Sequence, residues 1–302
     1  MEREVKRKRA RRAGVISGAV FVVLVAAATA MLLVANQSGG SSAVITAAPV
    51  SSFVTSSPPE PAAQPSPAPA SAAAIAPAVT EPVEPYTEIV LGSSVQGRQI
   101  TSVVFGEGAV RYLVIGGVHG DEWGAGAAEQ FVERLKADPS LVPEGTQIHV
   151  ITCLNPDGRA ADTRGNANKV DINRNMPASS WSQELDPRDS SSTRNLTGGT
   201  APGSEPESAI FIEYMGIGFS HVISLHSQGG IVDWDGEGGQ AIAQVIAGEV
   251  GYPVQHLGYQ AYIRGSMGAY VPEAWGIPII TVEMASSGLS DGLARGMLAT
   301  MQ

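Results

Sequence analysis

The sequence predicts an α/β fold with a mostly parallel central sheet that is covered by helices. Four short apolar runs have the composition of strands buried on both faces, and helical patterns lie between them. The strand runs are residues 111–118, 148–154, 221–227 and 277–284, and the helical patterns are residues 124–139, 204–218 and 238–253. Strands that alternate with helices in this way are typical of a sheet with helices on both faces.

The N-terminal part of the chain predicts a membrane anchor. Residues 1–12 carry seven Lys or Arg, and residues 13–35 are 23 uncharged, mostly apolar residues. A helix of this length spans about 34 Å, which is enough to cross a bilayer. A cleaved signal peptide is the alternative, but its apolar region is shorter. We therefore expect a single-pass membrane protein with a cytoplasmic N-terminus and an extracytoplasmic remainder.

Residues 36–86 predict a disordered linker between this anchor and a folded domain. Residues 37–86 hold ten of the chain's 20 prolines, mixed with Ala and Ser, and no apolar periodicity runs through them. A segment of this composition cannot bury a core and is typical of a disordered stalk with partly polyproline conformation.

Residues 87–302 predict one globular domain, which opens with two strands in "TEIVLGSSVQGRQITSVVFGEG". The domain has 12 basic and 24 acidic residues, a formal balance of −12, so no nucleic-acid partner is expected. Cys153 is the chain's one cysteine, which excludes an intrachain disulfide.

Polar residues follow the predicted strands at their carboxyl ends. The first strand is followed by His119 and Glu122, the second by "NPDG" (155–158), and the third and fourth end at His226 and Glu283. Functional sites of open α/β sheets form outside these strand ends. The polar residues therefore predict a site at one edge of the sheet.

His119, Glu122 and His226 together predict a catalytic zinc site. Two imidazoles and one carboxylate, with a fourth position open, form a common catalytic zinc set. A lone His-x-x-Glu pair is more often a surface pair, but here a second strand-end histidine and Glu283 accompany it. The remaining histidines, at positions 149, 221 and 256, lack such a setting and are expected to be structural.

A series of motifs resembles the zinc carboxypeptidase family, in particular its bacterial murein peptide amidase branch. In chain order they are "SVQGRQI" (94–100), "GGVHGDE" (116–122), "NPDGR" (155–159), "TRGNANKVDINRNMP" (163–177), "GSEPES" (203–208), "SLHS" (224–227) and "TVEM" (281–284). The resemblance covers nearly the whole globular part and implies a mixed, mostly parallel, carboxypeptidase-like sheet.

The resemblance also implies roles for individual residues beyond the zinc ligands His119, Glu122 and His226. Asp171 matches the acid that holds the first zinc histidine by its other ring nitrogen. Asn173 and Arg174 match the pair that binds the substrate's terminal carboxylate. Arg164 matches the arginine that stabilises the developing oxyanion, and Glu283 matches the general base.

Two departures from the family pattern concern specificity. The family's mobile-loop tyrosine precedes "GSMG" (265–268), and both Tyr259 and Tyr262 are available; Tyr259 is preferred. Met267 stands where the family often sets its side-chain preference, and it indicates no defined specificity.

The "GLSDG" segment (288–292) fits a nucleophile elbow, but that fold needs a histidine after the serine, and none follows position 256.

These observations predict a zinc metallopeptidase that hydrolyses the amide bond next to a C-terminal residue. The resemblance implies peptidoglycan stem peptides as substrate, cut between γ-D-Glu and diaminopimelate. A general carboxypeptidase acting on ordinary peptides, a related zinc N-acyl amino acid deacylase and a non-enzymatic binding module are the alternatives. A non-enzymatic binding module would be expected to lack one of the metal-ligating residues or the general base. The sequence has all of these residues.

Overall fold

The structure is a computed structural model that describes residues 85–189, 195–257 and 263–302. The predicted anchor (13–35), nearly all of the predicted linker (36–86) and the two candidate tyrosines, Tyr259 and Tyr262, lie outside these residues. Among the helices that the structure describes, none has the length and apolar character needed to cross a bilayer.

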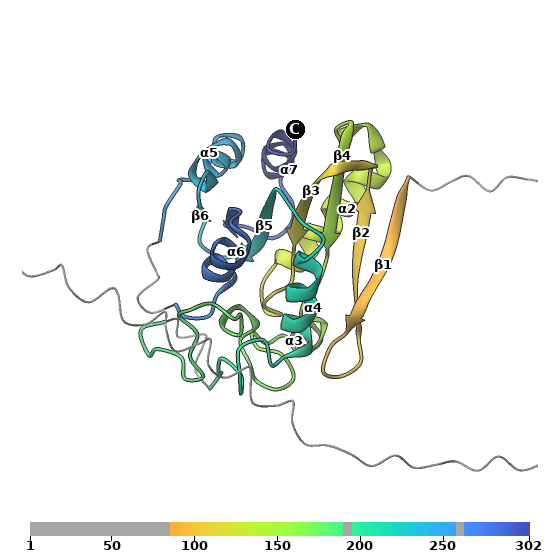
Figure 1. Cartoon of the computed structure of the whole chain (residues 1–302). Coiled ribbons are helices and arrows are strands. Elements are labelled where there is room, and N and C mark those ends of the chain that lie inside the picture. The colour runs from red at the N-terminus through yellow and green to blue at the C-terminus, as the bar shows by residue number, and fades with distance from the viewer. Residues whose placement is uncertain (1–84, 190–194, 258–262) are drawn as a thin grey trace, which may run out of the picture. The chain divides into compact units, whose positions relative to one another are not determined.

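The described residues form a mixed seven-stranded sheet with the order β1-β2-β4-β3-β5-β7-β6 (Figure 1). The four central strands β4, β3, β5 and β7 run parallel, and β1, β2 and β6 run antiparallel to their neighbours. The strands are β1 (Tyr86–Ser93), β2 (Gln99–Phe105), β3 (Gly108–Ile115), β4 (Gly145–Ile151), β5 (His221–Ser227), β6 (Ile231–Asp235) and β7 (Ile279–Met284). The predicted α/β class with a mostly parallel centre is confirmed.

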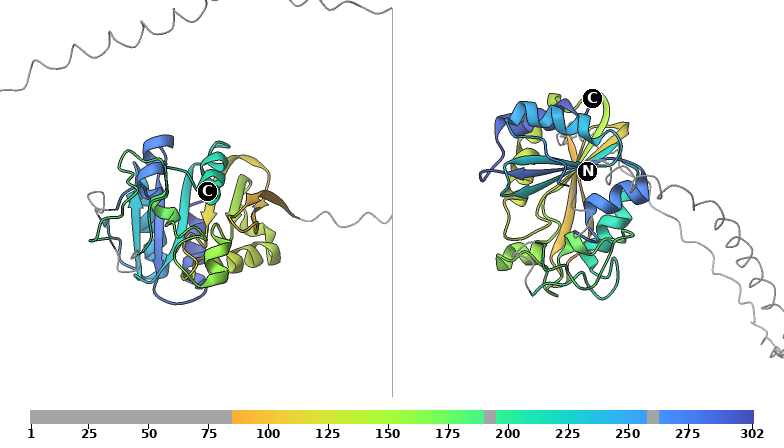
Figure 2. Two further views of the ribbon diagram at one scale, coloured as in Figure 1. Left: turned by 90° about the horizontal axis from the view of Figure 1, so that it is seen from below. Right: turned by 90° about the vertical axis from the view of Figure 1, so that its left-hand side faces the viewer.

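Helices cover both faces of the sheet (Figure 2). The helices are α2 (Gly124–Ala137), α3 (Pro156–Ala161), α4 (Pro206–Met215), α5 (Gly239–Val250), α6 (Met267–Trp275) and α7 (Asp291–Ala299), with short 3₁₀ turns at η1 (Pro139–Leu141) and η2 (Ile172–Arg174). The three helical patterns predicted from the sequence correspond to α2, α4 and α5.

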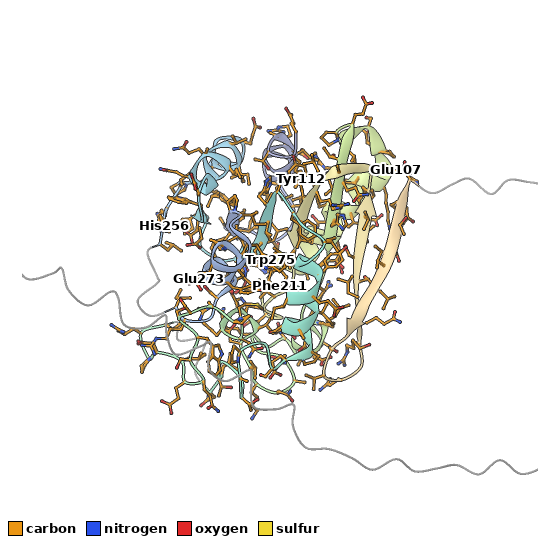
Figure 3. The ribbon with its side chains drawn as sticks, viewed as in Figure 1. Glu107, Tyr112, Phe211, His256, Glu273 and Trp275 are labelled. Atoms are coloured by element: carbon orange, nitrogen blue, oxygen red, sulfur yellow. The ribbon has the colours of Figure 1, made fainter. Side chains whose placement is uncertain are left out.

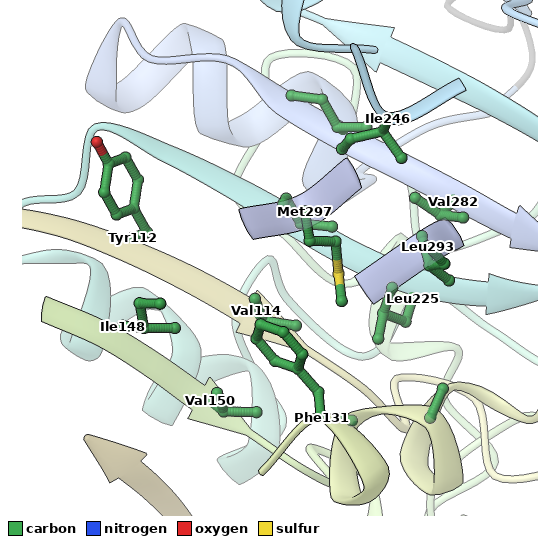
Figure 4. Close-up of a cluster of buried hydrophobic side chains, with 14 of the residues drawn as sticks. Tyr112, Val114, Phe131, Ile148, Val150, Leu225, Ile246, Val282, Leu293 and Met297 are labelled. Carbon is green, nitrogen blue, oxygen red and sulfur yellow. The ribbon is translucent and has the colours of Figure 1, made fainter. Parts of the chain in front are cut away.

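Two separate clusters of buried side chains hold the helices to the sheet. On one face Phe131 of α2, Ile246 of α5 and Met297 of α7 pack against the strands (Figure 4). On the other face Phe211 of α4 (labelled in Figure 3) packs with Tyr270 of α6, and their ring centroids are 6.4 Å apart. Because apolar residues cover both faces, the central strands are continuous apolar runs without alternation.

The sequence analysis misses β6 and the helices α3 and α6. Only the last four of the five residues of β6, "IVDWD", alternate apolar and acidic, and this stretch is too short for its period to stand out. Ser290 of the "GLSDG" segment caps α7, where its Oγ accepts from the Leu293 N–H at 3.1 Å. The hydroxyl therefore serves as a helix cap, as Ser commonly does.

Candidate metal centre

The loop between β3 and α2 carries His119 and Glu122 to the edge of the sheet. Gly117 adopts φ 62°, which glycine takes without strain. Gly120 lies so close to the neighbouring backbone that an added Cβ would come within 1.9 Å of the Gly158 carbonyl carbon. A larger residue at position 120 would push the loop away, so these glycines fix where the two side chains lie.

His119, Glu122 and His226 come together at the carboxyl ends of β3 and β5. His119 Nδ1 lies 2.7 Å from Glu122 Oε1, and His226 Nδ1 lies 2.9 Å from Glu122 Oε2. The two Nδ1 atoms are 3.2 Å apart, and one donor atom from each residue lies within 4.8 Å of the others. Both histidines are only 2 % exposed. Three ligand atoms therefore converge on one point.

This arrangement fits a zinc ion. Two nitrogen ligands placed about 2.1 Å from a tetrahedral centre lie about 3.4 Å from each other. The observed 3.2 Å between the Nδ1 atoms is close to that value. Two buried imidazoles and one carboxylate are also the donor types that catalytic zinc sites use. The group predicted from the sequence is therefore consistent with zinc.

Each histidine is oriented by a hydrogen bond from its other ring nitrogen. The Nε2–H of His119 donates to Asp171 Oδ1 at 3.2 Å, which leaves Nδ1 facing the site. The Nε2 of His226 lies 3.0 Å from Ser224 Oγ, and a metal bound at Nδ1 places the hydrogen on Nε2, from which it donates to the serine oxygen. Such partners fix the tautomer and ring orientation of metal-binding histidines. Asp171 lies where the resemblance implies, whereas the sequence analysis missed Ser224.

Ser224 could have been found from the strand period. Residues two apart in a strand point to the same face, so Ser224 and His226 of "HVISLHS" share one face of β5. The neighbouring leucine points to the other face, into the apolar cluster beneath α2.

Arg164 connects the two carboxylates of the site. Its Nε donates to Asp171 Oδ2 at 2.8 Å, and its Nη1 donates to Glu122 Oε1 at 3.1 Å. Burial opposes ionisation of Asp171, but the adjacent Arg164 guanidinium holds the pKa of this carboxyl well below its usual range. Burial likewise opposes ionisation of Glu122, and His119 and His226 outweigh it, so the Glu122 pKa is also strongly lowered. Both carboxylates are thus anionic.

The "NPDG" segment after β4 supports the loop that carries Arg164. Asn155 is completely buried, and its Oδ1 accepts from the Gly158 N–H at 2.8 Å to cap α3. Its Nδ2 donates to the Arg164 carbonyl oxygen at 3.3 Å. Asp157 pairs instead with Arg98, whose Nη1 donates to Asp157 Oδ1 at 2.6 Å. This segment holds the Arg164 loop in place.

Asn173 and Arg174 lie side by side in η2, near the metal group. Asn173 Oδ1 accepts from the Met267 N–H at 2.8 Å, which ties η2 to the start of α6. The Arg174 guanidinium donates to Asp189 through Nε (2.6 Å) and Nη2 (2.9 Å). The resemblance predicts a substrate carboxylate at Arg174, but a carboxylate of the chain itself is paired with it here.

A cavity of about 790 Å³ opens above the metal group and includes Glu283 in its lining. Glu283 pairs in register with His226, because β5 and β7 are parallel neighbours. Burial raises the pKa of Glu283, which favours a carboxyl that can accept and return a proton. The predicted general base therefore lies in the same cavity as the predicted metal ligands.

Basic and acidic side chains both line the cavity. Arg164 and Arg174 are among the lining residues, and β6 contributes Asp233 and Asp235, which we call the acidic wall. Ile231, Asp233 and Asp235 are two residues apart along β6, so they share the face that lines the cavity. Burial raises the pKa of Asp233, which is 8 % exposed. The sequence analysis missed this acidic wall together with β6.

Comparison with known proteins agrees with this geometry. The family model described as zinc carboxypeptidase matches residues 82–237, just over half of the chain. Murein peptide amidase A from Escherichia coli K12 is 40% identical over 100 residues, which are 32% of this chain and 39% of the relative. The chain thus matches about two fifths of the length of that curated relative.

Solved structures of similar proteins extend the likeness over the folded part. The murein-tripeptide amidase from Escherichia coli O157 has a TM-score of 0.55 at 25% identity, over 71% of this chain and 89% of that one. Carboxypeptidase A from Helicoverpa armigera has a TM-score of 0.55 at 17% identity, over 72% and 65% of the two chains, a likeness of fold alone. With the extent of the family match, these comparisons show that the chain belongs to the zinc carboxypeptidase family.

Proposed function

We propose that the protein is a zinc-dependent peptidase that hydrolyses the amide bond preceding a C-terminal residue, in peptidoglycan stem peptides between γ-D-Glu and diaminopimelate. The observation that carries the proposal is the convergence of His119, Glu122 and His226 in one cavity with Glu283. The similarity to murein peptide amidase A supports the substrate class.

In this proposal His119, Glu122 and His226 hold the zinc ion. Bound there, zinc would act as a Lewis acid toward the scissile carbonyl and would lower the pKa of water to about 7. Glu283 accepts a proton from the attacking water and returns it to the leaving amine. Arg164, which already donates to Glu122, offsets the charge that develops on the carbonyl oxygen. Asn173 and Arg174 orient the terminal carboxylate.

The acidic wall favours a diamino acid as the residue that is released. Glu283 pairs with Ile231, so Asp233 lies two residues and Asp235 four residues further along β6. These separations along the strand correspond to about 7 and 13 Å. A side chain that carries an ammonium group could reach the first of these carboxylates from the scissile bond. Diaminopimelate carries such a group, and this supports it over ordinary apolar residues.

The location proposed for this activity is outside the cytoplasm, behind the anchor predicted at residues 13–35. A long Pro-rich linker would let the domain reach a wall polymer. This part of the proposal rests on the sequence alone.

The proposal is tested with the purified, zinc-loaded full chain and two sets of substrates. One is L-Ala-γ-D-Glu-diaminopimelate, and the other is a mixture of ordinary peptides with free carboxyl ends, with products identified by mass spectrometry. The proposal expects release of diaminopimelate, and Glu283→Gln should lower kcat by roughly 10²–10⁴-fold while zinc content is retained.

Other product patterns would contradict parts of this proposal. Trimming of ordinary peptides alone would keep the zinc peptidase and reject the wall substrate. Cleavage of N-acyl amino acids alone would indicate the deacylase alternative. Substrate binding without turnover, unaffected by Glu283→Gln, would indicate a binding module.

A further inference from the structure

Each of the three guanidinium nitrogens of Arg174 donates a hydrogen bond to a group of the chain itself. Its Nε and Nη2 donate to the two oxygens of Asp189 at 2.6 and 2.9 Å, and its Nη1 donates to the Asn173 carbonyl oxygen at 2.7 Å. The side chains of Arg174 and Asp189 are each 4 % exposed. This two-point pairing is the geometry with which an arginine binds any carboxylate, including that of a peptide's end.

A tight turn presents Asp189 to this arginine. The turn "DPRD" runs from Asp186 to Asp189, and the Asp189 N–H donates to the Asp186 carbonyl oxygen at 2.9 Å. Asp186 Oδ1 accepts from the Arg188 N–H at 2.9 Å, and Pro187 occupies the second position, where its fixed φ suits the turn. The carboxylate is therefore held in position by a hydrogen-bonded turn.

We propose that Asp189 is a specificity-determining residue that competes with the substrate's terminal carboxylate for the Arg174 guanidinium. The inference rests on the proposed function, because it takes Arg174 as the receptor for that carboxylate. Asp189 and Arg174 both line the cavity that contains the metal group, so the contested position is inside the site.

Because of this competition, a free carboxylate at the end of the substrate adds little to the free energy of binding. A terminal carboxylate that reaches Arg174 has to replace the carboxylate of Asp189, so one charge-assisted pair is exchanged for another. A substrate with a carboxamide end leaves the Asp189 pair intact and loses little. The wild-type protein should therefore discriminate weakly between an acid and an amide at the released residue, unlike a site with an unpaired arginine.

The first test measures KM for the best substrate as the free acid and as the carboxamide of the released residue. In Asp189→Asn the Arg174 guanidinium faces a neutral group, and a charge-assisted bond to the substrate becomes available. We expect the ratio of KM for the amide to KM for the acid to rise about tenfold or more over wild type. An unchanged or smaller ratio would overturn the proposal.

Asp186→Asn is the matched control, since it removes one negative charge from the same turn. Asparagine keeps the side-chain oxygen that accepts from the Arg188 N–H, so the turn is retained. The KM ratio of this variant should equal that of wild type. A rise as large as that of Asp189→Asn would indicate a general charge effect and would also overturn the proposal.

A second test requires no catalysis and uses acetate as the probe. Asp189→Gly leaves a buried arginine without its carboxylate, so its Tm should fall. Acetate should raise the Tm of the metal-free variant markedly more than that of wild type, and acetamide should not. Equal responses of the two proteins to acetate would show that Arg174 is not a contested carboxylate receptor.

The two tests separate this inference from the proposed function. If no substrate is hydrolysed but acetate rescues Asp189→Gly, the proposed function fails and the competition at Arg174 stands. If substrates are hydrolysed but neither Asp189 variant behaves as expected, the peptidase stands and the inference fails.

Discussion

The two ends of β5 each carry a buried histidine, and the two residues have opposite surroundings. His221 begins the strand and is 3 % exposed, and His226 lies near its end and is 2 % exposed. His226 has Glu122, His119 and Ser224 around its ring, all polar. His221 packs against the Tyr112 ring at 4.9 Å, and Thr300 Oγ1 is 3.3 Å from its Nε2. Burial alone therefore does not make a histidine a metal ligand; convergent anionic partners do.

The largest effect should come from removing the histidine of the polar end. His226→Ala takes away one of the three proposed zinc ligands, so bound zinc and hydrolysis should both fall below detection in metal analysis and activity assays. His221→Gln is the counterpart at the other end of β5 and should keep wild-type zinc content and activity. Loss of zinc from His221→Gln as well would remove the distinction between the two ends.

The support of His119 by Asp171 should contribute less than a ligand does. Asp171→Asn weakens the acceptor for the His119 Nε2–H and also removes one of the two carboxylates that pair with Arg164. The affinity for zinc should fall about 10–100-fold, as is usual for such partners. Competition titration with a chelating dye would measure it. An affinity equal to wild type would mean that the hydrogen bond does not orient the ring.

The apolar end of β5 should make the protein sensitive to acid. Burial lowers the pKa of His221 to about 4, so between pH 6.5 and 4 the unfolded chain binds a proton that the folded chain does not. The free energy of unfolding is therefore larger at neutral pH and falls as the pH drops through this window. The loss is about 2 kcal/mol at pH 5.

Urea unfolding of wild type and His221→Gln between pH 7 and 5 would measure that contribution. The variant should lose less stability over this range, by about the same 2 kcal/mol. His149, whose pKa burial also lowers to about 4, remains in both proteins and contributes to the slope that they share. Parallel pH profiles for the two proteins would contradict the assignment of the slope to His221.

The smallest effect at the polar end should come from Ser224. Ser224→Ala removes the acceptor of the His226 Nε2–H and leaves that donor buried without a partner. One such hydrogen bond contributes about 0.5–1.5 kcal/mol, so zinc affinity should fall roughly two- to tenfold. An effect as large as that of Asp171→Asn would mean that the two histidines depend equally on their outer partners.

The parts of the fold that the sequence predicted are those with a local signal. The four parallel strands are apolar runs, and the three predicted helices have apolar residues at helical spacing. Among the site residues, His119 and Glu122 are three apart in one loop, and His226 and Glu283 end strands. For these positions the chain's local pattern and the tertiary arrangement agree.

The parts that could not be predicted depend on where distant segments meet. Asp189 reaches Arg174 from a segment without strands or helices among its described residues 176–189, and no residue spacing encodes that path. The acidic wall depends on β6 being added at the edge beside β7. The candidate catalytic residues were thus predicted from motifs, whereas the proposed specificity residues required the three-dimensional structure.

The register of the sheet also determines how the domain can be attached to a solid support. Tyr86, Phe105, Ile148, Tyr112 and His221 form one row of paired residues across the sheet. The C-terminus lies at the same end, since Tyr112 Oη donates to the Gln302 carbonyl oxygen at 3.2 Å (Figure 1). His226 is five residues further along β5, about 17 Å away. A resin or sensor chip coupled ahead of Tyr86 or after Gln302 would therefore leave the catalytic opening facing the solution.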